Sequence, residues 1–292
     1  MKNTSKKRNV YSRTNRSKLA LVICFLLFHQ LMYAQIPFDN NYKEVDDHEI
    51  VVAKGKSIIT EDCEKIVTVN SIENQNGFYD FQISRIDAIT GTVISSFSYG
   101  KPMSNDYCNA ISKSITEPDN YVLCGKSGNG NILVMEVKNT GTIVWSKTFK
   151  FGNKTSEALQ IFPLDIPFPS SHDKGYLIIG NLIDSLGHSS IATLRTNEEG
   201  ERLAALDYYM PTTSYLSNVA TDATLFYDGI HDRLRCAITG NHITSSTTKV
   251  FSMYIDAYSC DYVYNHSLYQ GTIGGVPVQS MNPQIVADYN GG

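Results

Sequence analysis

The sequence lacks the short motifs by which many enzyme families are recognised. It has no G-x-S-x-G nucleophile elbow, no H-E-x-x-H metal helix, no G-x-x-x-x-G-K-S/T phosphate loop and no EF-hand calcium loop. No C-x-x-C pair is present, so the cysteines do not indicate a metal site. The 292 residues therefore predict no catalytic residue, no metal site and no cofactor.

Helical periodicity and basic stretches are also missing from most of the chain. After position 34 no amphipathic run of ten or more residues follows the period of a helix. Residues 1–18 hold seven of the 25 Lys and Arg, which leaves 18 against 29 acids and a net charge of −11 for the remainder. An acidic chain of this kind predicts no nucleic-acid partner and no anionic membrane surface, and the oligomeric state stays open.

The first 34 residues have the three parts of a signal peptide. The basic residues 1–18 precede an apolar run, Leu19 to Phe28, and a small residue follows at Ala34. The apolar run is shorter than the roughly 20 residues of a membrane span, and His29 and Gln30 end it. We therefore predict cleavage after Ala34, a secreted or outer-surface location, and no transmembrane segment in the cleaved protein.

Four similar apolar β runs recur along the remainder and end at Asn70, Gly125, Gly180 and Gly240, at intervals of 55, 55 and 60 residues. The second copy shows the repeating unit, with β-rich runs at 109–116, 121–125, 132–137 and 142–149. Turn residues join these runs, and Gly141 can supply the positive φ of a tight hairpin. Four strands joined by hairpins predict one antiparallel sheet, and repeats of such a sheet are typical of a β-propeller.

The repeats divide the chain into a leader at 1–34, a linker at 35–48 and propeller repeats at 49–292. The expected blades are 57–100, 107–152, 156–210, 217–270 and a partial one at 277–292. The fourth departs from the pattern because Cys260 replaces the hairpin glycine, which predicts a weaker strand register there. A partial blade would leave an unpaired sheet edge, so we expect a fragment of a longer protein, with a five-bladed ring as the alternative.

Two stretches resemble the repeats of secreted bacterial β-propeller proteins, which follow the patterns D-G-G-Y-x-x-x-G and G-x-V-x-W. Asp173 to Gly180 matches the first pattern, and Val137 to Lys147 matches the second. The resemblance covers about residues 50 to 292 and implies the propeller fold. Proteins of this group often end in a type IX secretion sorting domain, which would lie beyond Gly292. The resemblance implies no particular activity.

Five cysteines remain after the leader, so at least one would be unpaired within the chain even in an oxidising compartment. The sequence leaves their connectivity open. Cys124 and Cys236 occupy equivalent positions in second strands, where a small buried hydrophobic residue is expected.

Three residues are candidates for ligand binding. The loop from Phe162 to Lys174 contains three prolines and enlarges a first hairpin, so Phe162 and Phe168 could form a rigid lip for a partner. The favoured interpretation is that this loop folds back over the rim and buries its own apolar groups. Asp222 is the only acid in the predicted first strands, 109–112, 158–161, 220–223 and 284–287, whereas paired-carboxylate hydrolysis needs two.

These features predict an exported, non-catalytic propeller that serves as a binding or scaffold module, with a protein or glycan partner at the cell surface. The alternative is a carbohydrate-binding protein or carbohydrate-active enzyme that uses the channel mouth. A quinone-dependent dehydrogenase would need a calcium site and a dense cofactor pocket, which the sequence does not indicate.

Overall fold

The computed structural model describes residues 57–59, 64–165, 174–208, 215–229, 231, 233–244, 248–269, 272–273 and 276–277. All of these lie in the compact unit His48–Gly292, and within them there are strands and turns but no helix. The all-β prediction is therefore confirmed for the part of the chain described. The leader, the linker and the partial blade, apart from Pro277, lie outside these residues.

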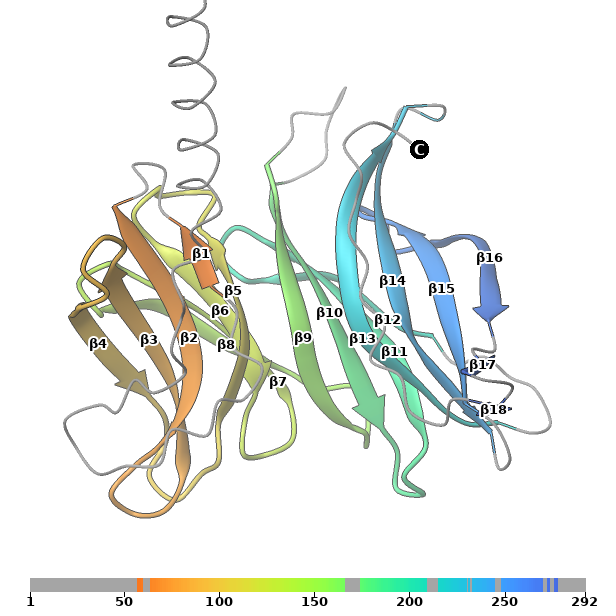
Figure 1. The fold of residues 1–292 in the computed structure, drawn as a ribbon, viewed down its shortest axis with the longest axis horizontal. Coiled ribbons are helices and arrows are strands. Elements are labelled where there is room, and N and C mark those ends of the chain that lie inside the picture. The colour runs from red at the N-terminus through yellow and green to blue at the C-terminus, as the bar shows by residue number, and fades with distance from the viewer. Residues whose placement is uncertain are drawn as a thin grey trace, which may run out of the picture. The chain divides into compact units, whose positions relative to one another are not determined.

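Sixteen of the strands form four antiparallel sheets, each a simple meander in chain order (Figure 1). The first sheet contains β1 (Ser57–Ile59), β2 (Lys65–Glu73), β3 (Tyr79–Asp87) and β4 (Val93–Tyr99). The second contains β5 (Tyr107–Lys113), β6 (Tyr121–Lys126), β7 (Ile132–Val137) and β8 (Ile143–Phe149). The third contains β9 (Thr155–Leu164), β10 (Gly175–Ile183), β11 (Ser189–Asn197) and β12 (Arg202–Tyr208). The fourth contains β13 (Tyr215–Asp228), β14 (Arg233–Thr244), β15 (Thr248–Asp256) and β16 (Tyr262–Tyr269), and a short pair, β17 (Thr272–Ile273) and β18 (Val276–Pro277), follows it.

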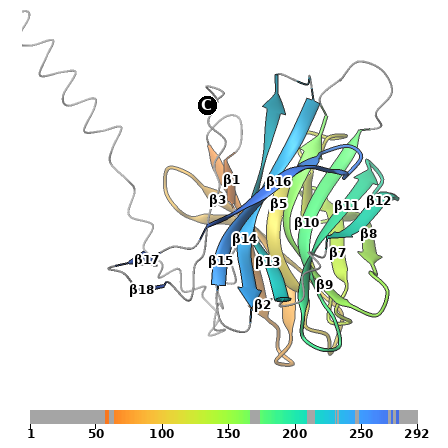
Figure 2. The ribbon, with the colours of Figure 1, turned by 90° about the vertical axis from the view of Figure 1, so that its right-hand side faces the viewer.

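The sheets pack face to face in chain order, which gives a propeller-like arrangement (Figure 1; Figure 2 views it from the side of the fourth sheet). The first strands of neighbouring sheets lie together, because β5 contacts both β1 and β9, and β9 contacts β13. Buried apolar side chains fill each of the three spaces between sheets. Phe81 and Leu123 are central between the first and second sheets, Tyr176 between the second and third, and Phe251 between the third and fourth.

The glycines that end the second, third and fourth sequence repeats each lie opposite a β-bulge in a first strand. A Cβ at Gly125 would lie 1.8 Å from the carbonyl oxygen of Tyr107. The corresponding distances are 2.3 Å from Glu157 for Gly180 and 2.1 Å from Val219 for Gly240. The register of each first strand shifts at this place, so its carbonyl approaches the second strand too closely for any side chain. This close approach is the physical reason for the periodic glycine.

The turn between the third and fourth strands of each sheet has the left-handed backbone conformation that the sequence predicts at Gly141. Gly91, Gly141 and Gly200 have φ angles of 71°, 87° and 75°, and Cys260 takes the same left-handed conformation with φ 63°. For a residue other than glycine this conformation costs about 1–2 kcal/mol. The predicted weaker register is found only in part. A shift beside the third hairpin occurs in all four sheets, and the fourth sheet has one more, between Ser252 and Tyr254.

Candidate functional site

Polar side chains join the first strands of neighbouring sheets. Asn109, the extra residue of the β5 bulge, donates through Nδ2 to Oε1 of Glu157 at 2.7 Å and to the carbonyl oxygen of Ala158 at 2.8 Å. A bulge turns a side chain out of the regular alternation, which lets Asn109 reach β9. Gln160 on β9 in turn donates through Nε2 to Oδ1 of Asp222 on β13. We call Asn109, Glu157, Gln160 and Asp222 the inter-strand polar row.

The polar row combines buried amides with half-buried acids. Asn109 and Gln160 are 6% and 7% exposed, whereas Glu157 and Asp222 retain partial access to solvent. Burial is the main cause of the raised pKa of Tyr107, at the start of β5. The Glu157 carboxylate lies close enough to contribute to this rise. Its ring packs against Tyr79, with the ring centroids 5.2 Å apart and the planes inclined by 30°.

The polar row presents two carboxylates that act as hydrogen-bond acceptors in fixed positions. Each accepts from an amide on the preceding first strand, so its orientation is set before any ligand arrives. Carboxylates of this kind can accept hydrogen bonds from the hydroxyl or N–H groups of a ligand.

Sequence analysis identified Asp222 but missed Glu157. The prediction began the first strand at Ala158, whereas β9 begins at Thr155 and therefore includes Glu157. An alignment of the repeats could have identified it. Glu157 and Tyr107 occupy equivalent positions, because each directly precedes the first-strand residue that pairs with the second-strand glycine.

The other two candidate residues lie at the enlarged first hairpin. Phe162 is on β9, half-buried, and packs against the apolar cluster between the third and fourth sheets. Leu164 is almost completely buried, and Asp165 forms an ion pair with Lys174 that joins the two ends of the loop. Phe168 lies outside the described residues. Ligand binding by Phe162 and Phe168 stays a prediction.

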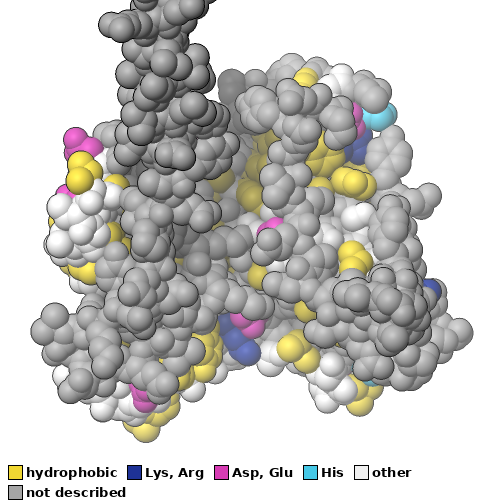
Figure 3. Space-filling view, viewed as in Figure 1, with side chains coloured by type: hydrophobic (Ala, Val, Ile, Leu, Met, Phe, Trp, Pro, Cys, Tyr) yellow, Lys and Arg dark blue, Asp and Glu magenta, His cyan; other side chains and the backbone are white. Residues whose placement is uncertain are grey.

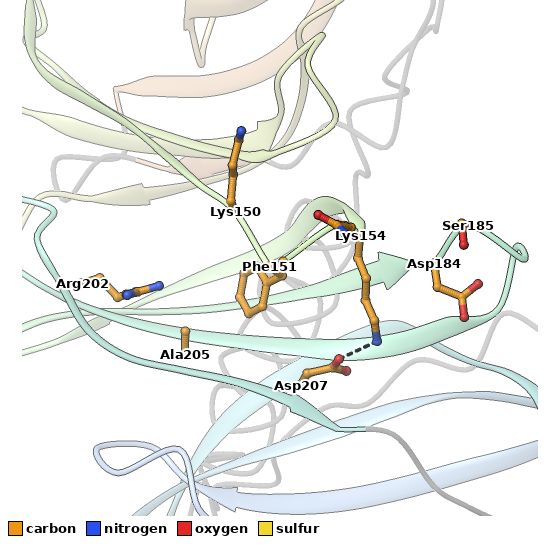
Figure 4. Close-up of a pocket in the computed structure, with 10 residues that line it drawn as sticks. Lys150, Phe151, Lys154, Asp184, Ser185, Arg202, Ala205 and Asp207 are labelled. Carbon is orange, nitrogen blue, oxygen red and sulfur yellow. Dashed lines mark hydrogen bonds and ion pairs between the residues drawn. The ribbon is translucent and has the colours of Figure 1, made fainter.

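A pocket of about 600 Å³ lies elsewhere, beside the outer strand β12 (Figure 4). Its walls are the link between the second and third sheets, the β10–β11 hairpin and one face of β12. The lining residues are Lys150, Phe151, Gly152, Asn153, Lys154, Asp184, Ser185, Arg202, Ala205 and Asp207. Sequence analysis singled out none of them, because they come from three separate segments and form no motif.

Two acids of this pocket already have partners. Lys154 Nζ lies 2.5 Å from Oδ2 of Asp207 and 3.3 Å from Oγ of Ser190. Asp184 Oδ1 accepts hydrogen bonds from the backbone N–H groups of His188 and Leu186, and these bonds hold the pKa of Asp184 below its usual value.

Other chemical possibilities are limited within the described residues. They contain no group of three or more His, Cys, Asp or Glu side chains placed to hold a metal ion. Nor does any helix long and apolar enough to cross a membrane occur among them. On the face shown in Figure 3, the Lys and Arg side chains of the described part form no continuous patch.

The four cysteines within the described ranges are buried, as expected for Cys124 and Cys236, and none of these four forms a disulfide. Cys108 belongs to the cluster between the first and second sheets, and Cys124 to the cluster between the second and third. These two thiols therefore lie on opposite faces of the second sheet. Cys63 lies outside the described residues.

Comparison with known proteins gives matches among solved structures. No protein-family model matches the chain, and no curated protein matches its sequence. An exo-β-1,3-galactanase from Phanerochaete chrysosporium, solved with β-1,3-galactotriose, aligns with a TM-score of 0.42 and 13% identity over 76% of this chain and 53% of that one. An exo-β-1,3-galactanase from Clostridium thermocellum aligns with a TM-score of 0.32 and 11% identity, over 78% and 59% of the two chains. This chain thus spans little more than half the length of either enzyme, and similarity at this level assigns it no activity.

Proposed function

We propose that this chain is an exported, non-catalytic β-propeller module that binds a partner through the polar row. The observation that carries the proposal is the pairing of both acids with amides, Glu157 with Asn109 and Asp222 with Gln160. General acid or base catalysis requires a group that exchanges a proton with the reacting atom. A carboxylate aligned by an amide donor is instead suited to accept a hydrogen bond from a ligand held in one orientation.

The location completes the proposal. The leader at 1–34 and the likeness of the repeats to those of secreted bacterial propeller proteins support a role outside the cell. The partner is then a protein or a glycan at the cell surface. Hydrogen-bond acceptors in a fixed arrangement suit either class.

The test is a binding screen with the purified exported protein against a glycan array and against extracellular proteins. We expect the partner found in the screen to lose at least about tenfold in affinity when Asp222→Asn or Gln160→Ala disrupts the polar row. The matched control is Asp119→Asn, which removes one acid from an exposed turn and should leave affinity unchanged. Unchanged binding by both polar-row variants would refute the proposed site.

A second candidate is a carbohydrate-active enzyme. The observation in its favour is that Glu157 and Asp222 supply two carboxylates from neighbouring first strands, and glycoside hydrolysis commonly uses two carboxyl groups. Release of sugars from a polysaccharide, abolished separately by Glu157→Gln and by Asp222→Asn, would establish this candidate and exclude the non-catalytic one.

A further inference from the structure

We propose that the pocket beside β12 binds an acidic saccharide, one whose sugar ring bears a carboxylate. The inference rests on the proposed binding role and adds to it a second site with a defined ligand class. Four features of the pocket carry it: the Arg202 guanidinium, the aromatic side chain, the open backbone turn and the aligned acceptor at Asp207.

The charge of the pocket opposes that of the chain. Three cations and two acids line it, although the whole chain has a net charge of −4. Lys154 is neutralised by Asp207, and Asp184 is held by backbone N–H groups and lies 3.3 Å from Nδ1 of His188. The side chains of Lys150 and Arg202 are exposed and make no hydrogen bond or ion pair within the described part of the chain. The lining residues therefore carry a net charge of +1. The Lys150 side chain extends away from Phe151 (Figure 4), so Arg202 is the cation placed to receive an anion.

Phe151 gives the pocket an apolar surface between its charged groups. It is half-buried and packs against the cluster between the second and third sheets, which fixes its position. The Arg202 side chain extends along the pocket toward Phe151, while Lys154 extends the other way, to Asp207 (Figure 4). A ring that lies on Phe151 would therefore have a guanidinium near one edge and a carboxylate acceptor near the other.

The turn that carries Phe151 is open to a ligand. Gly152 has φ +58°, and no atom lies within 4 Å of the place where its Cβ would be. Lys154 donates its backbone N–H to the carbonyl oxygen of Phe151 at 3.1 Å, which closes the turn below this space. The glycine lets a ligand approach the backbone directly.

Together these groups match a sugar acid better than a simple anion. The apolar C–H face of a sugar ring packs against an aromatic ring, its hydroxyls can donate to Asp207, and its carboxylate can pair with the guanidinium of Arg202 in the bidentate mode. Inorganic phosphate or sulfate would use only the cations, and a neutral sugar would use only Phe151 and Asp207.

The experiment compares two trisaccharides of the same α-1,4 linkage by titration calorimetry with the exported protein. Trigalacturonate has a carboxylate at C6 of each ring, and galactotriose has a neutral hydroxymethyl group there. We expect trigalacturonate to bind at least about tenfold more tightly than galactotriose, and Arg202→Gln to remove this difference. The matched control, Lys138→Gln, removes one exposed cation from the turn between β7 and β8 and should change neither affinity. Thermal unfolding of each variant verifies that it is folded.

The outcomes separate this inference from the proposed function. Equal affinities for the two trisaccharides, no binding of either, or an unchanged affinity in Arg202→Gln would overturn the acidic-saccharide site. Competition by inorganic sulfate at an equal concentration would overturn it as well, since it would show a simple anion site. If Asp222→Asn abolishes binding of trigalacturonate and Arg202→Gln does not, the ligand occupies the polar row, so the proposed function stands and this inference fails.

Discussion

The indole ring of Trp145 on β8 covers Gly200 in the next sheet so closely that a Cβ at position 200 would lie 2.7 Å from Cζ3 of the ring. Phe97 on β4 has the same relation to Gly141, where a Cβ would lie 2.4 Å from Cδ1. An aromatic side chain on an outer strand therefore packs onto the hairpin glycine of the following sheet. These glycines serve both the turn and the contact between sheets.

Replacement of Gly200 by alanine should destabilise the protein for two reasons. Its φ of +75° costs a residue with a side chain about 1–2 kcal/mol. The clash with Trp145 should add about 1–3 kcal/mol. Gly187→Ala is the matched control, because Gly187 has φ +83° but no atom within 4 Å of a Cβ. Chemical denaturation measures the unfolding free energy of both variants. Equal losses in Gly200→Ala and Gly187→Ala would show that the ring contact contributes nothing.

Gly125→Ala should be among the most damaging single substitutions in the second sheet. The new methyl group would overlap the carbonyl oxygen of Tyr107, which is backbone and cannot move without breaking the bulge. We expect a loss of at least about 3 kcal/mol in unfolding free energy. Asn70→Ala, at the equivalent position of the first sheet, is the control and should cost about 1 kcal/mol or less. A well-folded Gly125→Ala variant with near wild-type stability would contradict the explanation of the repeat.

Glu136 is a buried acid whose role is structural. Its carboxylate, in a side chain 2% exposed, accepts from Ser114 Oγ at 2.9 Å, Asn120 Nδ2 at 2.8 Å and Trp145 Nε1 at 2.8 Å. Glu136→Ala would leave these donors without their acceptor and should cost about 3 kcal/mol or more. Glu201→Ala, which removes an exposed ion pair with Lys147, should cost less than about 1 kcal/mol. Similar losses in the two variants, measured by urea denaturation, would refute this role.

Tyr99 should make stability fall at alkaline pH. Burial raises the pKa of Tyr99 to about 12, and its hydroxyl donates to the carbonyl oxygen of Gly141 at 3.0 Å. In the unfolded chain the tyrosine pKa is about 10, so between about pH 10 and about pH 12 the unfolded state binds fewer protons and the unfolding free energy declines. Tyr99→Phe should be less stable than wild type at neutral pH by about 1 kcal/mol.

The difference between wild type and Tyr99→Phe should shrink as the pH rises through that range, because only the wild type has this hydroxyl to ionise. Denaturation at a series of pH values measures this difference in unfolding free energy. Tyr227→Phe, at a 51% exposed residue, is the control for the general loss of stability at alkaline pH. A constant difference at all pH values would contradict the assignment.

Much of the fold could be predicted from sequence because strands and turns depend on near neighbours. The run 132–137 coincides with β7, and Gly141 has the positive φ that the hairpin pattern indicated. The predicted ends of strands were less accurate. The predicted start of the first strand in the third sheet lay three residues after the observed start of β9, so the prediction left out Glu157. The alternation of apolar and polar residues along the sequence cannot locate a strand end that is set by pairing with a partner strand.

The candidate sites depended on contacts that no local pattern contains. Asn109 and Glu157 are 48 positions apart, and Gln160 and Asp222 are 62 apart. The pocket beside β12 likewise joins a link, a hairpin and an outer strand.

The amino-acid sequence alone determined the repeat, the strands and the hairpin glycines, because alternation of side chains and the sign of φ are local properties of the backbone. Only the tertiary structure decided which acids meet which amides and where the pocket lies. Those pairings arise when separate sheets pack face to face, and the energy of such a contact depends on both partners at once.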